Sequence, residues 1–210
     1  MIVSLNEIET TILKAARGAG MAWGLAEEAA EAARWLATRG LSFEAPLASL
    51  LEREAWRSDI DFDGRSLRPR AAQDWLCPIR AGAFLSDFGD KPPVRLERVL
   101  YPLLLAPFAA RREGRAELSW DRATLRFDGG RLALPSQWRS LLDVARVDTA
   151  ELRPAGASET SASFLAPREG GMTIDDAAWS KLQIFEARVY VPASLQSRLS
   201  GAGAALSDND

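Results

Sequence analysis

A glycine-rich turn near the start of the chain carries the densest group of candidate functional side chains. Lys14 and Arg17 stand just before Gly18 and Gly20, the glycines that open the turn. Backbone amides at the start of the next helix attract anions, and the two cations would add to that attraction. These four residues are therefore candidates for binding a carboxylate or phosphate. The alternative, which we favour, is a tight helical hairpin whose glycines serve only the turn and close packing.

Glu27 and Glu28 are the candidate acid–base residues. Adjacent residues on a helix point about 100° apart, so these two cannot share a face, but Glu31 shares a face with each of them. Close carboxylates raise the pKa of at least one of them and could supply a general acid or base. The alternative is a solvated first helical turn, or pairing with Arg34.

The residue types that are missing exclude several kinds of catalysis. The chain has no histidine and one cysteine, Cys77. Ser-His-Asp and Cys-His catalysis, and zinc sites built on histidine or on cysteine alone, are therefore excluded within one chain. The glycines of the turn follow a helix and not a strand, which argues against a dinucleotide site. We expect neither a metal nor a cofactor, and we interpret Cys77 as a buried thiol beside Trp75.

Two further charged clusters have competing interpretations. The acidic run at 59–64 matches the first half of a calcium-binding loop. Its twelfth position, where a glutamate should bind the ion, is Arg70, so we interpret the run as a polar strand or turn edge. The arginines that follow either clamp an anion or pair with these aspartates. This cluster comprises Arg65, Arg68, Arg70 and Arg80.

The net charge and hydropathy of the chain restrict which partners it is expected to bind and where in the cell it is expected to lie. The net charge of −3 and the isoelectric point near 5.3 give no general attraction to nucleic acid or anionic lipid. The longest apolar stretch, at 100–108, is too short to span a bilayer and contains two prolines. The first residues do not have the pattern of a secretory signal. Together with the single cysteine, these features predict a cytoplasmic protein that binds neither nucleic acid nor membrane.

Helical signals are concentrated in residues 1–57. Ser4 and Glu7 have the spacing of a capping box, and apolar residues then recur with helical period up to Gly18. A second helix is expected from 21 or 22 to 39, with acids early and bases late. A third helix is expected at 46–56.

The remainder of the chain predicts mostly strands and loops. Residues 58–95 read as loops with at most one strand, and 95–110 as a short helix broken by prolines. The alternation at 115–134, with a glycine turn at 128–130, is typical of a β meander. Further elements are expected as helical turns at 137–142, strands at 143–153, 158–165 and 185–191, a helix starting at 173, and a short helix at 194–199.

These elements predict an α+β fold in a single domain spanning 1–210. An N-terminal helical hairpin and a third helix, about 1–57, would pack on a mainly antiparallel sheet from the C-terminal half, with a β-rich part at about 115–192.

Short motifs at both ends of the chain resemble a known family. The N-terminal motifs are Ser4-Leu5-Asn6-Glu7-Ile8-Glu9, Lys14-Ala15-Ala16-Arg17-Gly18-Ala19-Gly20, Trp23-Gly24-Leu25-Ala26-Glu27-Glu28 and Arg34-Trp35-Leu36. The C-terminal motifs are Tyr190-Val191-Pro192-Ala193-Ser194, Ser197-Arg198, Gly201-Ala202-Gly203 and Asp208-Asn209-Asp210. They are similar to an uncharacterised bacterial family, the domain of unknown function numbered 3726. The resemblance implies one domain in a bacterial cytoplasm, and no activity, substrate or site.

Two functional hypotheses follow. In the first, the protein is a small-molecule metabolic protein, and potentially an enzyme, that binds an anionic, carboxylate-bearing ligand near the glycine turn. Lys14 and Arg17 would hold the anion, and Glu27 or Glu28 would move a proton. In the second, it is a non-catalytic binding or accessory subunit that acts through protein contacts, for example as a homodimer. The size of an α+β domain favours the first hypothesis by a small margin, because such domains commonly form a pocket.

Overall fold

The fold is seen in a computed structural model, which describes residues 1–88, 93–135, 138–156 and 164–190. Its helices are α1 (Leu5–Gly18), α2 (Trp23–Ala37), α3 (Glu44–Glu52), α4 (Pro78–Phe88), α5 (Ala106–Ala110), α6 (Trp138–Leu142) and α7 (Asp176–Ala187), with 3-10 turns η1 (Ala55–Arg57) and η2 (Pro102–Leu105). Its strands are β1 (Ile2–Val3), β2 (Ile60–Phe62), β3 (Ser66–Pro69), β4 (Val94–Leu100), β5 (Arg115–Trp120), β6 (Ala123–Asp128), β7 (Arg131–Ala133), β8 (Arg146–Pro154), β9 (Phe164–Leu165) and β10 (Met172–Thr173). The predicted α+β class is confirmed.

The helical hairpin forms as the capping and glycine signals predict. The Ser4 hydroxyl caps α1 by accepting a hydrogen bond of 3.2 Å from the amide of Glu7. Val3 and Ile8, on either side of this cap, are fully buried, as expected of a hydrophobic staple. The helix ends at Gly18, and Gly20 has a φ of +93°, a left-handed conformation that favours glycine.

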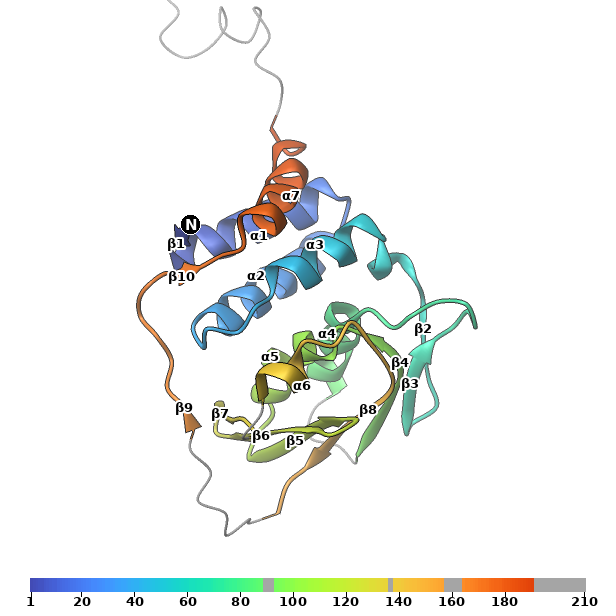
Figure 1. Ribbon diagram of the computed structural model, residues 1–210. Helices are drawn as coiled ribbons and strands as arrows, with labels where there is room; N and C mark the ends of the chain where they lie inside the picture. Colours follow the sequence, from blue (N-terminus) through green and yellow to red (C-terminus); the bar gives the residue numbers. More distant parts are fainter. Residues whose placement is uncertain (89–92, 136–137, 157–163, 191–210) are drawn as a thin grey trace, which may run out of the picture.

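Helix α2 lies at the centre of the helical part because it is built of small residues. Its buried residues are Ala26, Ala29, Ala30, Ala32, Ala33, Leu36 and Ala37. It packs against α1 on one side and against α4 and α5, which cover the sheet, on the other (Figure 1). Alanine side chains allow neighbouring helices to approach closely from both directions.

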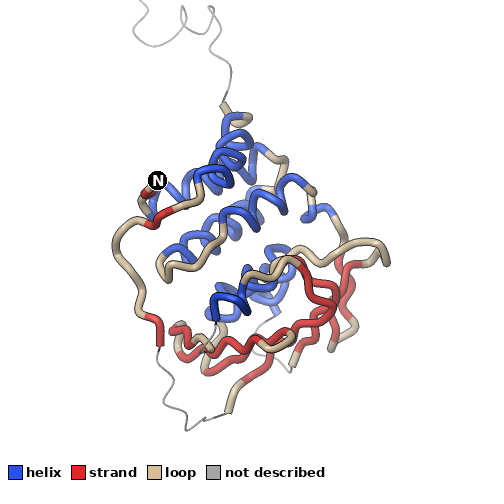
Figure 2. Tube along the Cα trace, in the orientation of Figure 1, coloured by secondary structure: helices blue, strands red, loops and turns tan. Residues whose placement is uncertain are grey.

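The main sheet has the strand order β2-β3-β4-β8-β5-β6-β7-β9. The neighbouring strands are antiparallel except for β3 and β4, which are parallel. Figure 2 shows the strands of the main sheet on one side of the molecule with the helices above them. The short strands β1 and β10 pair separately and join the start of the chain to the segment that precedes α7.

More of the chain forms strands of the main sheet than the sequence pattern predicts. Strands β2, β3 and β4 lie before residue 115, within segments expected to be helix or loops with at most one strand. The expected helix at 95–110 is wrong in its first part, because β4 continues to Leu100 before Pro102 and Pro107 start η2 and α5. The meander at 115–134 and the strand at 143–153 are confirmed as β5 to β7 and β8.

The expected strand at 185–191 is wrong, because α7 continues to Ala187. Ala178, Trp179, Leu182 and Phe185 recur at helical spacing and are buried against α1 and α3. The apparent alternation beyond Phe185 includes the exposed Val189 and so does not mark a buried strand face. The expected strand at 158–165 is described only at its end, as β9, and the expected helix at 194–199 lies outside the described residues.

A buried carboxylate joins the three central strands. Glu117 on β5 lies directly opposite Arg126 on β6 and Arg153 on β8. Its carboxylate accepts hydrogen bonds of 2.8 Å from Arg126 Nε and 2.6 Å from Arg153 Nη2. Burial by itself raises the pKa of Glu117, but the two arginines outweigh that effect and lower the pKa below its ordinary value.

Replacing Gly18 by alanine should destabilise the protein. An added Cβ would lie 1.9 Å from the carbonyl oxygen of Phe185, so α1 and α7 would have to separate. We expect a loss of about 1–3 kcal/mol or more, measured by urea unfolding. Gly24→Ala is the matched control, since its Cβ would meet no atom within 4 Å and should leave stability unchanged or slightly higher. Equal stability of the two variants would contradict the close packing of α1 on α7.

Glu117 should make stability depend on pH. Since folding lowers its pKa, the ionised form stabilises the fold above the ordinary carboxyl value of 4.5, and this contribution disappears as pH falls through the lowered pKa. The Tm difference between the wild type and Glu117→Gln should therefore be constant near neutral pH and shrink below about pH 4.5. A difference that grows on acidification would contradict this assignment.

Candidate functional site

Lys14 is held by residues at the end of α7. Its ammonium group donates a hydrogen bond of 2.7 Å to the Tyr190 hydroxyl and lies 3.7 Å from a carboxylate oxygen of Glu186. The hydrogen bond to Tyr190 is the main cause of a raised pKa for Lys14. This predicted ligand-binding residue thus links α1 to α7.

Arg17 is turned toward the glycine turn itself. Its guanidinium donates to the carbonyl oxygen of Met21 and lies 5.6 Å from the centre of the Trp23 ring. Gly18 leaves room for α7, and Gly20 provides the left-handed turn. Lys14 and Gly18 thus serve the contact with α7, and Arg17 and Gly20 serve the turn. The role of these four residues in binding an anion stays a prediction.

The two candidate acid–base residues have different partners. Glu27 accepts a hydrogen bond of 2.6 Å from the Trp23 indole. Glu28 and Glu31 share a face of α2 and bind one guanidinium, that of Arg111, at 2.5 and 2.8 Å. The partner considered from the sequence, Arg34, instead pairs with Glu9 at 2.7 Å. The structure therefore does not bring Glu27 and Glu28 to a common partner.

The charged clusters downstream pair with each other. Arg68 binds Asp61 at 2.8 Å and Asp63 at 3.2 Å, and Arg70 and Arg80 both lie within 3.5 Å of Asp59. Of the two interpretations, ion pairing is the one that the geometry favours. Among the described residues, no group of three or more acidic or cysteine side chains could hold a metal ion.

Cys77 is a buried free thiol at the start of α4. Burial raises its pKa to about 11, so it is protonated and weakly nucleophilic near neutral pH. This agrees with its interpretation as a structural residue.

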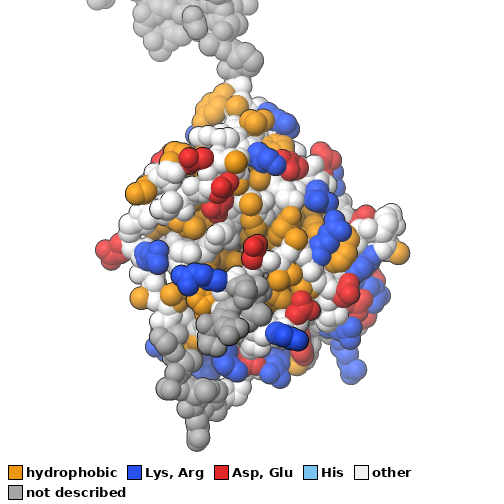
Figure 3. All heavy atoms as spheres, in the orientation of Figure 1, with side chains coloured by type: hydrophobic (Ala, Val, Ile, Leu, Met, Phe, Trp, Pro, Cys, Tyr) orange, Lys and Arg blue, Asp and Glu red, His pale blue; other side chains and the backbone are white. Residues whose placement is uncertain are grey.

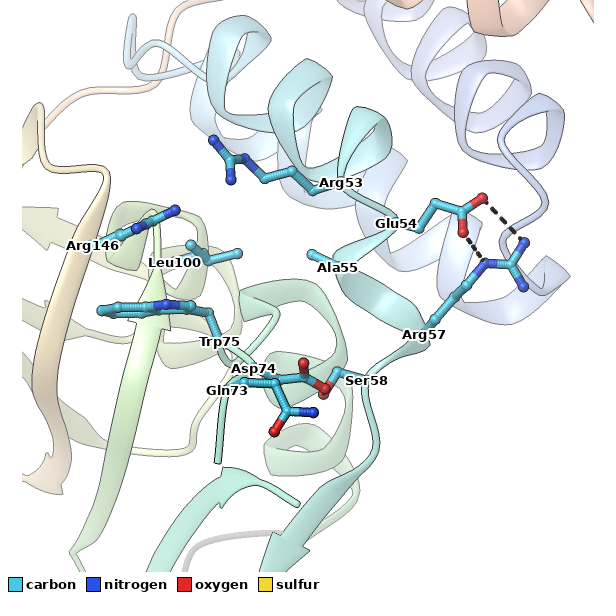
Figure 4. A pocket seen from close by; sticks show the side chains of 10 residues that line it. All are labelled: Arg53, Glu54, Ala55, Arg57, Ser58, Gln73, Asp74, Trp75, Leu100 and Arg146. Atoms are coloured by element: carbon cyan, nitrogen blue, oxygen red, sulfur yellow. Dashed lines mark hydrogen bonds and ion pairs between the residues drawn. The ribbon is translucent and has the colours of Figure 1, made fainter. Parts of the chain in front are cut away.

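A cavity of about 430 Å³ opens between the end of α3, η1 and the ends of β4 and β8 (Figure 4). We call it the arginine cavity, since Arg53, Arg57 and Arg146 all line it. The other lining residues are Glu54, Ala55, Ser58, Gln73, Asp74, Trp75 and Leu100. Three arginines against two acids, Glu54 and Asp74, leave its lining with one net positive charge.

The charges in the arginine cavity are unequally paired. Arg57 binds Glu54 at 2.7 Å, and Asp74 accepts a hydrogen bond of 2.7 Å from the Ser58 hydroxyl. Arg53 donates to the neutral hydroxyl of Ser49, at 3.1 Å, and Arg146 lies over the Trp75 ring, 5.1 Å from its centre. Within the described ranges, neither Arg53 nor Arg146 pairs with a carboxylate. Arg53 and Arg146 thus face this cavity with guanidinium N–H groups that can still donate to a ligand.

The arginine cavity lies next to the predicted site. A guanidinium nitrogen of Arg57 is 3.5 Å from the position that a Cβ on Gly20 would occupy. The glycine turn and the cavity are therefore neighbours, although Lys14 and Arg17 are not among the residues that line the cavity.

Sequence reasoning did not identify Arg53, Ser58 or Arg146. These residues come from three separate segments, and none belongs to a motif with a characteristic spacing. Composition gives no signal for them either, because the chain has 29 acidic residues against 26 basic ones. Which arginines remain unpaired depends on the tertiary structure.

Comparison with known proteins supports the family resemblance. Residues 3–75 match the model of a family described as "Protein of unknown function (DUF3726)". The match includes α1 to α3 and the N-terminal motifs, and the C-terminal motifs lie beyond it. No curated protein matches the chain.

A solved structure, described as malate dehydrogenase from Pyrococcus horikoshii OT3, is similar over 65% of this chain with 13% sequence identity and a TM-score of 0.39. The similar region is 48% of that chain, about half its length. In the described part of this chain, no helix is both long and apolar enough to cross a membrane.

Proposed function

We propose that this protein binds a small anionic, carboxylate-bearing ligand in the arginine cavity, at the edge of the glycine turn. The observation that carries the proposal is that Arg53 and Arg146 face one cavity and have no carboxylate partner among the described residues. A guanidinium has five donors in a planar fork that matches a carboxylate, and an anion between the two groups would relieve their mutual repulsion.

The other walls of the cavity suit such a ligand. Trp75 supplies an aromatic surface, while Gln73 and Ser58 supply polar groups that can fix its orientation. Arg57 is already neutralised by Glu54, so it adds less attraction than the other two arginines. The volume of about 430 Å³ suits a small molecule.

The same geometry supports binding more than catalysis. The Ser58 hydroxyl bonds to Asp74, but a carboxylate is a weak base for activating a serine, and the chain has no histidine. Glu27 and Glu28, the residues predicted to move a proton, bind Trp23 and Arg111. A metabolic binding protein of a bacterial cytoplasm, without a nucleic-acid partner, agrees with the acidic isoelectric point and the buried Cys77.

A second candidate function is assembly with another copy of this chain. Apolar side chains are exposed around the glycine turn: Trp23 is 59% exposed, Val189 45% and Tyr190 55%. Figure 3 shows hydrophobic side chains on the surface near the end of α7. Val189 lies beside Gly18, 3.3 Å from the position of an added Cβ, and Tyr190 accepts a hydrogen bond from Lys14, so both lie next to the glycine turn. Exposed apolar patches commonly mark protein interfaces.

The anion proposal predicts stabilisation by small carboxylates such as succinate or citrate. At about 100 times the Kd, a ligand stabilises the folded state by about 2.7 kcal/mol, which raises the Tm by several degrees for a chain of this size. The double variant Arg53→Ala/Arg146→Ala should lose this response. Arg122→Ala, at an exposed turn, is the matched control and should keep it.

Sodium chloride at equal ionic strength separates specific binding from salt screening. An undiminished response in the double variant would refute the arginine cavity as the site. A response lost in Lys14→Ala or Arg17→Ala alone would place the anion at the glycine turn instead.

The assembly candidate predicts a dimer of twice 22.9 kDa by light scattering at micromolar concentration. Val189→Glu should shift it to monomer, because a charge in an apolar interface is costly to desolvate. Arg122→Ala again serves as control. A monomer at every concentration tested would rule this candidate out.

A further inference from the structure

A second, larger cavity of about 710 Å³ lies between α3, the segment from Tyr101 to η2, and α6. We call it the apolar cavity. Its apolar walls include Leu41, Leu103, Leu104, Trp138, Leu142 and Val144. Four charged residues also line it, and all four are exposed to solvent: Arg139, Asp143, Arg168 and Asp175.

The buried acid in the wall of the apolar cavity is already satisfied. Glu44 is 5% exposed, and its carboxylate accepts hydrogen bonds of 2.8 Å from the amide of Phe43 and 3.3 Å from the amide of Asp175. Because backbone groups neutralise it in part, Glu44 does not require a cation from a ligand. The interior of this cavity therefore suits an apolar group.

The two cavities are adjacent along two chain segments. Leu100 lines the arginine cavity and the next residue, Tyr101, lines the apolar cavity. In the same way, Arg146 lines the first and Ala145 lines the second. The amide of Tyr101 donates to the carbonyl oxygen of Ala145 at 2.9 Å, which fixes the two segments together at the boundary.

A chain of hydrogen bonds also runs from one cavity to the other. The Tyr101 hydroxyl donates to Ser49 Oγ at 2.7 Å, and the same oxygen accepts from Arg53 Nε at 3.1 Å. Tyr101 has a φ of +42°, a left-handed conformation that is unusual for a large side chain. Such backbone outliers are concentrated at functional sites, where the surrounding structure holds them.

We propose that the two cavities form one bipartite site and that the ligand is an amphipathic carboxylate. Its carboxylate lies between Arg53 and Arg146, and its apolar group passes Tyr101 into the apolar cavity. This inference rests on the proposed function of the arginine cavity. It adds that an apolar group on the ligand contributes to affinity and that Tyr101 stands at the boundary between the two parts.

Calorimetric titration with linear carboxylates of two, four, six and eight carbons tests this inference in the full chain. Each methylene group that enters the apolar cavity should tighten binding about three- to fourfold, so hexanoate should bind on the order of 100-fold more tightly than acetate. Val144→Trp, which fills part of the apolar cavity, should remove the dependence on length. Arg122→Ala is the control.

The outcomes separate the two proposals. If no carboxylate of any length binds, both proposals fail. If acetate and octanoate bind with equal Kd and both depend on Arg53 and Arg146, only the bipartite site fails. If octanoate binds as tightly to Arg53→Ala/Arg146→Ala as to the wild type, the apolar cavity acts alone and the bipartite site is again contradicted. The titration of the wild type with carboxylates of different length tests the bipartite site even if Val144→Trp does not fold.

Discussion

The close packing of small residues in the helical part is the constraint on which the rest of the structure depends. Alanines on two sides of α2 allow α1 to pack on one side and α4 and α5 on the other. Gly18 then allows α7 to approach α1 so closely that a single methyl group would collide with the Phe185 carbonyl. With α1 and α7 fixed, α3 is held against α7, and its end faces the ends of β4 and β8.

Both cavities arise at this boundary between α3 and the sheet. Leu100 and Arg146 are the last paired residues of β4 and β8 at this boundary and line the arginine cavity, and the next residue, the left-handed Tyr101, lines the apolar cavity. Elsewhere in the sheet, arginines form ion pairs with acids on neighbouring strands, as Arg126 and Arg153 do with Glu117. The arginines at the boundary differ from these, because Arg53 and Arg146 point toward a cavity and not toward an acid on a neighbouring strand.

Local signals in the sequence predicted the parts of the fold that depend on local interactions. The cap at Ser4, the glycines after α1 and the alternation in β5 to β7 act over a few residues, and each is confirmed. Strand β4 was mistaken for a helix, since its pairing with β3 and β8 comes from distant segments. The arginine cavity could not be predicted for the same reason, because the residues that line it come from segments nearly a hundred residues apart. The site predicted at the glycine turn lies near this cavity because the side chain of Arg57 extends to Gly20.

A crystal structure of the protein with bound octanoate would test the central claim most directly. The account predicts the carboxylate within hydrogen-bonding distance of Arg53 and Arg146, with the hydrocarbon chain beyond Tyr101 in contact with Trp138 or Leu142. A carboxylate bound beside Lys14 and Arg17, with both cavities empty of ligand, would contradict it.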